Sequence, residues 1–185
     1  MFIIETKQFL ALDAQSLNLD KSTFAKLRVS LKKKTDEFKF VDMDKLCIPL
    51  VHLPEIDIDL FKDKIDSIAQ STPPFDLKLS GLSAYPDLIQ GRMIWIGVQN
   101  TRELRELQSQ LEALFYPESE QEYKPTLPLV RMRNHHNVTD ALSPYKSTKF
   151  PVLNAQKIIL YEMTSGGAYP AIKPVLEFGL TVELP

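Results

Sequence analysis

The side chains best suited to acid–base or nucleophilic chemistry are few in this chain of 185 residues, which has one cysteine and three histidines. Cys47 lies in an apolar stretch with His52 five residues later, and His135 and His136 closely follow Arg131. A thiol can act as a nucleophile or redox group, and an imidazole can move protons near neutral pH. An arginine can bind a phosphate. These side chains set the chemistry that the sequence permits.

The same small counts exclude several classes of protein. One cysteine allows neither an internal disulfide nor a cysteine-based zinc cluster, and three histidines leave little room for a metal site. With 6 glycines, a glycine-cradled phosphate site is disfavoured. The net charge of −2 argues against nucleic-acid binding through bulk charge, and there is no DNA-binding signature. We expect no metal and no organic cofactor.

The beginning of the chain bears on localisation. Residues 1–7 lack a basic leader, and Glu5 and Lys7 interrupt their apolar run, so no signal peptide is expected. No stretch approaches the ~18 apolar residues of a membrane span. We expect a cytoplasmic protein that does not bind membranes.

Hydrophobic periodicity predicts helices over 22–34, 57–69 and 101–115, with Ser22 and Thr101 as N-caps. Residues 137–148 are expected to form a loop with one helical turn. Strands are expected over residues 3–12, 38–41, 46–53, 75–79 with a continuation over 81–86, 93–98, 126–133, and a final hairpin of 157–163 and 175–182 around Gly166-Gly167.

This order of elements implies an α+β protein with mostly antiparallel sheets and helices packed outside. A strand–helix–hairpin unit occurs at least twice, and no linker rich in proline or serine divides the chain. We therefore expect a single domain over residues 1–185, built from two pseudo-symmetric lobes. The cleft between the lobes is the expected ligand site. The apolar run 93–98 predicts a central strand covered on both faces, with Trp95 in the core.

Several short sequence segments, in their order and spacing, resemble the two-histidine phosphoesterase superfamily. The likeness is to its LigT-like branch of bacterial RNA 2′,3′-cyclic phosphodiesterases, also called 2′-5′ RNA ligases. The segments on which this resemblance rests are residues 9–13, 75–86, 92–98 and 104–115. The resemblance covers nearly the whole chain and implies the LigT-like two-lobed fold with a central cleft.

The resemblance also implies a reaction. Members carry two His-x-Thr motifs, one per lobe, and the period of a strand places both side chains of a motif on one face. One histidine acts as general base and the other as general acid on a phosphodiester, while the threonine hydroxyls bind the phosphate oxygens.

All four motif positions differ in this sequence. Cys47 and Pro49 stand where the first histidine and threonine are expected, and Thr126 and Pro128 stand at the second pair. Arg131 fits the family's pattern, where an arginine can contact phosphate or form a structural salt bridge. A threonine hydroxyl is no general base near neutral pH, and a free thiol has a pKa near ~8.5. Proline offers neither a hydroxyl nor an N–H group.

Three functions remain open. The first is a catalytically inactive LigT-like homologue whose cleft binds a nucleotide, an RNA end or another small ligand. The second is an active 2′,3′-cyclic phosphodiesterase or RNA-end-processing hydrolase that uses other residues, such as His135, His136 or Arg131. The third is a protein-interaction module with a filled cleft. Candidate ligand contacts are Cys47, Thr126, Arg131 and Tyr85, the last at a turn where it can stack on a base.

Proline inside a paired strand removes a ladder hydrogen bond, so both motif strands are predicted to be bulged or unpaired at Pro49 and Pro128.

In regular strands, His52 would point away from the face of Cys47, and Arg131 away from that of Thr126. We expect His52 at the surface or behind the site. His135 and His136 are expected in a surface loop, since no third metal ligand is visible.

Overall fold

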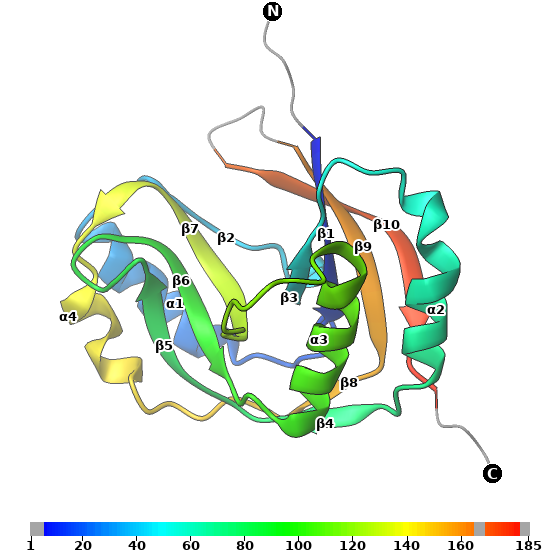
Figure 1. Ribbon diagram of the computed structural model, residues 1–185. Coiled ribbons are helices and arrows are strands. Elements are labelled where there is room, and N and C mark those ends of the chain that lie inside the picture. Colours follow the sequence, from blue (N-terminus) through cyan, green and yellow to red (C-terminus); the bar gives the residue numbers. More distant parts are fainter. Residues whose placement is uncertain (1–5, 165–168, 182–185) are drawn as a thin grey trace, which may run out of the picture.

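The computed structural model describes residues 6–164 and 169–181. Its two four-stranded sheets are antiparallel and carry helices on their outer sides (Figure 1). The strands are β1 (Thr6–Asp13), β2 (Phe38–Phe40), β3 (Cys47–His52), β4 (Phe75–Leu77), β5 (Leu79–Tyr85), β6 (Gly91–Val98), β7 (Thr126–His136), β8 (Leu153–Ala155), β9 (Lys157–Thr164) and β10 (Ala171–Gly179). The helices are α1 (Lys21–Lys32), α2 (Lys62–Gln70), α3 (Arg102–Phe115) and α4 (Thr139–Leu142). This α+β architecture confirms the predicted fold class.

The first sheet has the strand order β10-β9-β1-β3. Along β1, Leu10 and Leu12 enter the main core, whereas Phe9 and Ala11 join a smaller apolar cluster on the other face. Helix α2 packs against β10, and α3 packs against β3. The alternation of the strand therefore separates a helix-covered face from a face that is free to line a site.

The second sheet has the order β2-β7-β6-β5, so β6 is a central strand as predicted. Its two faces differ, however: Ile94 and Ile96 are fully buried, while Met93 and Trp95 are only partly buried. The expectation that both faces are covered, with Trp95 in the core, is wrong. An antiparallel sheet can leave one face open, and an apolar run does not reveal which one.

Helix α3 forms as predicted, because its apolar residues recur on one face. Leu104, Leu107 and Leu111 are buried, and the Thr101 Oγ1 accepts a hydrogen bond from the Leu104 N–H at 3.3 Å. The cap of α1 is Asp20 rather than Ser22, because the Asp20 carboxylate accepts bonds from the first turn. None of the helices in the described part of the chain is both long and apolar enough to cross a membrane.

Other differences are local. The helix expected over 57–69 is a 3-10 turn, Ile58–Leu60, followed by α2. The strand expected over 75–79 breaks at Lys78 because β4 leaves the second sheet to pair with β8, which was not predicted.

The final hairpin forms from β9 and β10, and β10 begins earlier than expected, at Ala171. Its predicted tip, Gly166-Gly167, and residues 3–5 and 182 lie outside the described residues. The helical turn expected within 137–148 is α4.

Candidate functional site

Strand β3 carries a bulge beside its proline. Pro49 lies opposite Ala11 of β1, but Val51 lies opposite Leu10, so the register passes over Leu50. This irregularity confirms the prediction made from the proline. The extra residue bends the strand and shifts the alternation of every side chain that follows it.

The bulge changes the side on which His52 lies. His52 is opposite Phe9 and therefore shares a face with Pro49 and Cys47. Its ring lies 5.5 Å from that of Phe9, centroid to centroid. The expectation that His52 points away from the motif face is wrong, because it assumed a regular strand.

Strand β7 repeats this arrangement. Pro128 lies opposite Trp95 of β6, but Val130 lies opposite Ile94, so Leu129 is passed over. The predicted irregularity at the second proline is thus also present. The two bulges occupy equivalent places, directly after the third position of each motif.

The second bulge acts on Arg131 as the first does on His52. Arg131 lies opposite Met93 and shares a face with Thr126 and Pro128, instead of pointing to the other side. Both motif strands therefore present, on the motif face, a polar residue five positions after the first motif residue.

These faces line a cleft between the sheets. A cavity of about 470 Å³ includes Tyr85, Thr126, Arg131 and His52, and a narrower extension of about 90 Å³ includes Cys47. Residues common to both parts are Phe9, Pro49, Pro128, Arg131, Tyr169 and Pro170. The structure thus places all four candidate ligand contacts in one continuous cleft, with Cys47 at its narrow end.

Cys47 is poorly suited to proton transfer. Only 6% of the residue is exposed, and this burial raises the pKa of its thiol from 9.0 to about 12. The positive charge of Arg131 opposes the shift, and the negative charge of Asp13 adds to it. At neutral pH the thiol stays protonated, so it is neither a base nor a thiolate nucleophile.

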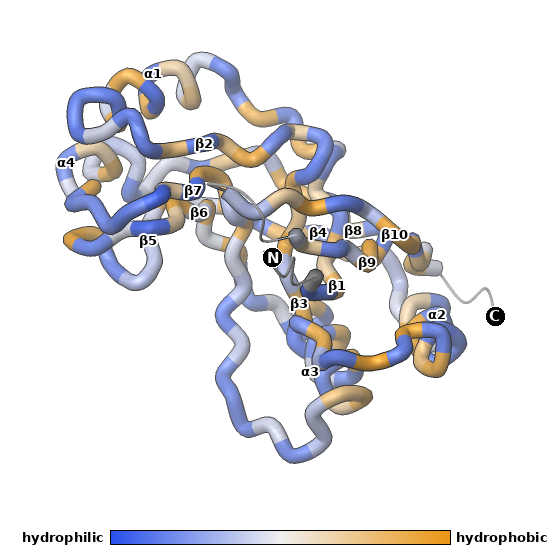
Figure 2. The backbone as a smooth tube through the Cα atoms, turned by 90° about the horizontal axis from the view of Figure 1, so that it is seen from above, coloured by the Kyte–Doolittle hydropathy of each residue, from blue (hydrophilic) through white to orange (hydrophobic). Residues whose placement is uncertain are grey.

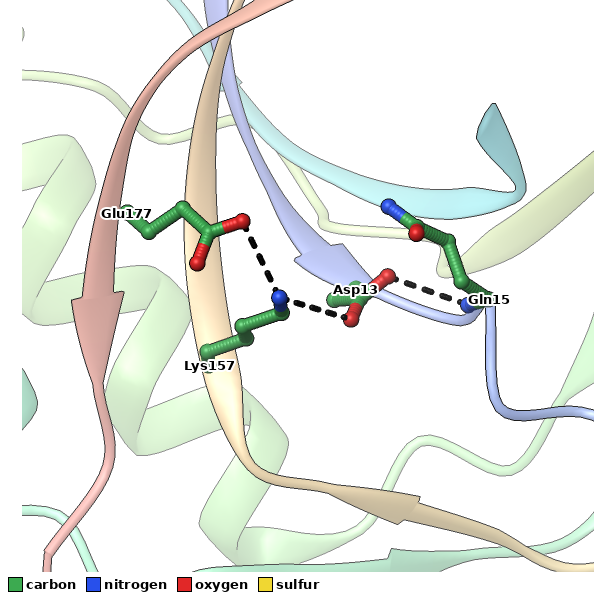
Figure 3. A network of polar contacts seen from close by, with 4 residues as sticks. All are labelled: Asp13, Gln15, Lys157 and Glu177. Carbon is green, nitrogen blue, oxygen red and sulfur yellow. Dashed lines mark hydrogen bonds and ion pairs between the residues drawn. The ribbon is translucent and has the colours of Figure 1, made fainter. Parts of the chain in front are cut away.

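Asp13 lies opposite Cys47 on the neighbouring strand, and its carboxylate is already bound by other groups of the protein (Figure 3). Asp13 Oδ1 accepts the backbone N–H of Gln15 at 3.0 Å, and Oδ2 lies 3.5 Å from Lys157 Nζ. Lys157 also donates to Glu177 Oε1 at 3.0 Å, and this bond is the main cause of its raised pKa. With both oxygens engaged, Asp13 does not offer a free base to the cleft.

Besides Arg92, which lines the wide part, the cleft contains Arg131, a cation that both parts share. It is half-buried, and burial lowers the pKa of its guanidinium. No carboxylate among the described residues forms an ion pair with it. Lys39 lies opposite Arg131 on β2 and lines the same narrow extension. A partly buried guanidinium without an acidic partner is suited to bind an anion.

The three histidines occupy different places. The pKa of His52 is lowered by burial, then by the charges of Arg131 and Lys7, so its imidazole is neutral near pH 7. His135 and His136 belong to β7 rather than to a loop, which corrects the expectation for them. His136 Nε2 lies 3.7 Å from Glu37 Oε2. Neither of these two is among the residues that line the cleft.

Sequence reasoning missed several residues of the cleft: Phe9, Lys39 and Tyr169 line it. The alternation of β1, which sets Phe9 and Ala11 apart from Leu10 and Leu12, is a signal that could have identified Phe9. For Lys39 and Tyr169 the sequence holds no such signal, because their positions depend on strand pairing and on the final hairpin.

Comparison with known proteins agrees with this geometry. Residues 46–144 match the sequence model of the 2′-5′ RNA ligase superfamily. The RNA 2′,3′-cyclic phosphodiesterase of Methanocaldococcus jannaschii is 30% identical over 174 residues, which cover 89% of this chain and 97% of that protein.

Solved structures share the fold. A Thermus thermophilus protein superposes with a TM-score of 0.63 at 17% identity, covering 96% of this chain and 100% of its own. The LigT protein of E. coli, solved with NADP+, gives a TM-score of 0.61 at 20% identity, covering 96% and 99%. Together with the two-sheet architecture and the paired motif strands, these matches show that the chain belongs to the 2′-5′ RNA ligase superfamily.

Proposed function

We propose that this protein is a catalytically inactive member of its family whose cleft binds a phosphate-bearing ligand, such as a nucleotide or an RNA end. This proposal rests mainly on Arg131, a half-buried cation in the cleft that has no acidic partner among the described residues. The buried thiol of Cys47 fits a reducing, cytoplasmic compartment, where we place this function.

The motif positions support the loss of activity. Removing one acid–base group typically costs ~10²–10⁴ in rate, and here neither histidine position can titrate near pH 7. Cys47 is held protonated, and Thr126 has no proton to exchange in that range. Pro49 and Pro128 provide no hydroxyl for the phosphate oxygens.

The shape of the cleft supports ligand binding. The wide part, about 470 Å³, lies within the range of ~300–1,000 Å³ typical of small-molecule sites, whereas the narrow part is too small for a nucleotide. Tyr85 is 64% exposed at the wide part, where its ring can stack on a base. The related LigT protein has been solved with the nucleotide NADP+. This favours a ligand site over a filled cleft.

Binding is tested by titrating 3′-AMP and adenosine 2′,3′-cyclic phosphate while following Trp95 fluorescence. Trp95 is the single tryptophan and lies opposite Pro128. Arg131→Gln should weaken binding by about 10–100-fold, the usual worth of a charge-assisted hydrogen bond. Arg102→Gln is the control, since it removes the same charge from an exposed pair with Glu106 on α3. Equal affinity in both variants would contradict the proposed phosphate contact.

Activity is tested by incubating the protein with the cyclic phosphate and following product formation. We expect no turnover above the rate without protein. Turnover that persists in Cys47→Ala and disappears in a histidine variant would overturn the inactive assignment.

One observation favours the active alternative, through His52 rather than His135 or His136. The bulge of β3 places His52 in the cleft, and its lowered pKa leaves a neutral imidazole that can accept a proton. Among the described residues that line this wide part, there is no second histidine and no cysteine or carboxylate to serve as its partner. If the protein turns over substrate, His52→Gln should abolish the activity, while His135→Gln should leave it unchanged.

A further inference from the structure

A second, larger cavity shares His52 with the wide part of the cleft and shares no lining residue with the narrow end. It has a volume of about 810 Å³ and lies between α3, β3 and the connection of residues 116–125. Figure 2 shows that this hydrophilic connection projects from the rest of the protein before the chain returns to β7. Two tyrosines fix its ends to β3: Tyr116 Oη donates to the His52 carbonyl at 2.9 Å, and Tyr123 Oη donates to the Pro49 carbonyl at 2.8 Å. We call this space the α3 hollow.

The lining of the α3 hollow is acidic. Glu112 of α3 and three glutamates of the connection, Glu118, Glu120 and Glu122, surround it. Lys124 lies 3.6 Å from Glu122 and offsets one of these charges. The remaining carboxylates give the hollow a net negative charge, which attracts cations.

These carboxylates do not converge on one point. Among the described residues, no group of three or more histidine, cysteine, aspartate or glutamate side chains is close enough together to hold a metal ion. A compact divalent cation needs several oxygen ligands within a single coordination sphere. Carboxylates spread around an open hollow instead suit a long cation that carries several separated positive charges.

An independent observation points to a ligand. Gln108 lines the hollow with only 6% of its surface exposed, and its side chain forms no hydrogen bond with any described residue. The fully buried, unpaired polar atoms of the described residues do not include those of Gln108, so its amide remains accessible from the hollow and is open to a partner there. A ligand N–H group bound to the Gln108 carbonyl oxygen would provide that missing partner.

We infer that the α3 hollow binds an alkylammonium polycation. Its protonated nitrogens would meet the separate glutamates, and one would donate to the Gln108 amide. Linear polyamines and the lysine side chains of a peptide both offer this chemistry. The site is separate from the phosphate contact of the proposed function, because Arg131 does not line the hollow.

The experiment is isothermal titration calorimetry of the full chain at low salt with three probes: spermidine, a tetralysine peptide and magnesium chloride. The main variant is the triple change Glu118→Gln, Glu120→Gln and Glu122→Gln. We expect saturable binding of an organic cation that weakens by about tenfold or more in this variant, since each exposed charge contributes modestly. Spermidine binding indicates a polyamine site, and binding of the peptide alone indicates a protein ligand.

A matched control removes three exposed carboxylates elsewhere, through Asp36→Asn, Asp44→Asn and Glu55→Gln. It should keep the original affinity. An equal loss in both triple variants would show unspecific charge attraction and overturn the site. Absence of binding by both organic cations, or preference for magnesium, would overturn it as well.

Gln108→Leu tests the buried amide separately from the surface charges. The leucine fills a similar volume without an unpaired polar group, so the thermal midpoint of unfolding should be kept or raised. Affinity for the organic cation should nevertheless fall by about five- to tenfold, the worth of one hydrogen bond. Unchanged affinity in a folded Gln108→Leu protein would rule out the proposed contact.

Discussion

Strands β3 and β7 share a proline followed by a bulge, but they present different surfaces to the cleft. Each has a proline at the third motif position and a bulge directly after it. On β3, however, the first motif residue, Cys47, is buried at 6% exposure, whereas Thr126 on β7 is half-buried and lines the wide part of the cleft. The cleft therefore has a closed β3 wall at Cys47 and an open, cationic β7 wall at Thr126 and Arg131. The two halves of the cleft are thus not equivalent, although their motif strands are built alike.

The reactivity of a thiol on each strand gives the largest expected contrast. Burial raises the pKa of Cys47 from 9.0 to about 12, so its thiolate fraction at pH 8 is about a thousandfold below that of an ordinary cysteine. Alkylation by iodoacetamide in the native protein should be slower by a similar factor. A Cys47→Ala, Thr126→Cys protein places a thiol on the open wall and should react far faster. Equal rates would show that the two walls are equally accessible.

Restoring both motifs tests whether the scaffold itself is still competent. The quadruple variant Cys47→His, Pro49→Thr, Thr126→His, Pro128→Thr should hydrolyse adenosine 2′,3′-cyclic phosphate at least about 10²-fold faster than the natural protein, since one acid–base group is worth ~10²–10⁴. Restoring only the β3 pair leaves no general acid, so that variant should gain little. A folded quadruple variant without turnover would mean that the bulges or the narrow floor also prevent catalysis.

The two tyrosine anchors of β3 should contribute unequally to stability. Tyr123 is half-buried, and burial raises the pKa of its hydroxyl, so Tyr123→Phe leaves the Pro49 carbonyl without this partner at a place that water reaches less easily. We expect a loss of about 1–2 kcal/mol in the free energy of unfolding. Tyr116→Phe, at an exposed bond to the His52 carbonyl, should cost less, because water can replace the hydroxyl. Urea denaturation of both variants measures the difference, and a larger loss in Tyr116→Phe would reverse the assignment.

The pH dependence of His52 should be the smallest effect. Its pKa is lowered in the folded protein, mainly by burial, so the unfolded chain binds the proton more readily. Its contribution to stability is therefore complete above the unfolded pKa, near ~6.5, and is lost as the pH falls through the folded pKa. His52→Gln should flatten the stability profile between pH 7 and 5, measured by thermal denaturation. His135→Gln, at an exposed position, should leave that profile unchanged.

Much of the fold could be predicted from the sequence because hydrophobic spacing is a local signal. The stripe of α3, with Leu104, Leu107 and Leu111, forms the expected buried face, and its N-cap is Thr101 as predicted. The pairing of β4 with β8 could not be predicted, because three-residue strands carry too little pattern to define a partner. The open face of β6 likewise depends on which side the helices cover.

The candidate site was predictable in its positions but not in its orientation. The bulges followed from Pro49 and Pro128, yet the same bulges reversed the expected directions of His52 and Arg131. Regular alternation of side chains does not continue past the irregularity that each proline indicates. One extra residue in a strand moves every later side chain to the other face.

The sequence by itself determined the kind of fold, the two motif strands and the absence of histidine at Cys47 and Thr126. Those properties depend on residue types and on their local order, which the chain carries directly. Only the tertiary structure decided that Cys47 is sealed, that Arg131 and His52 enter the cleft, and that the α3 hollow holds the unpaired amide of Gln108. Burial, strand register and long-range pairing fix these features, because each arises between segments that lie far apart in the sequence.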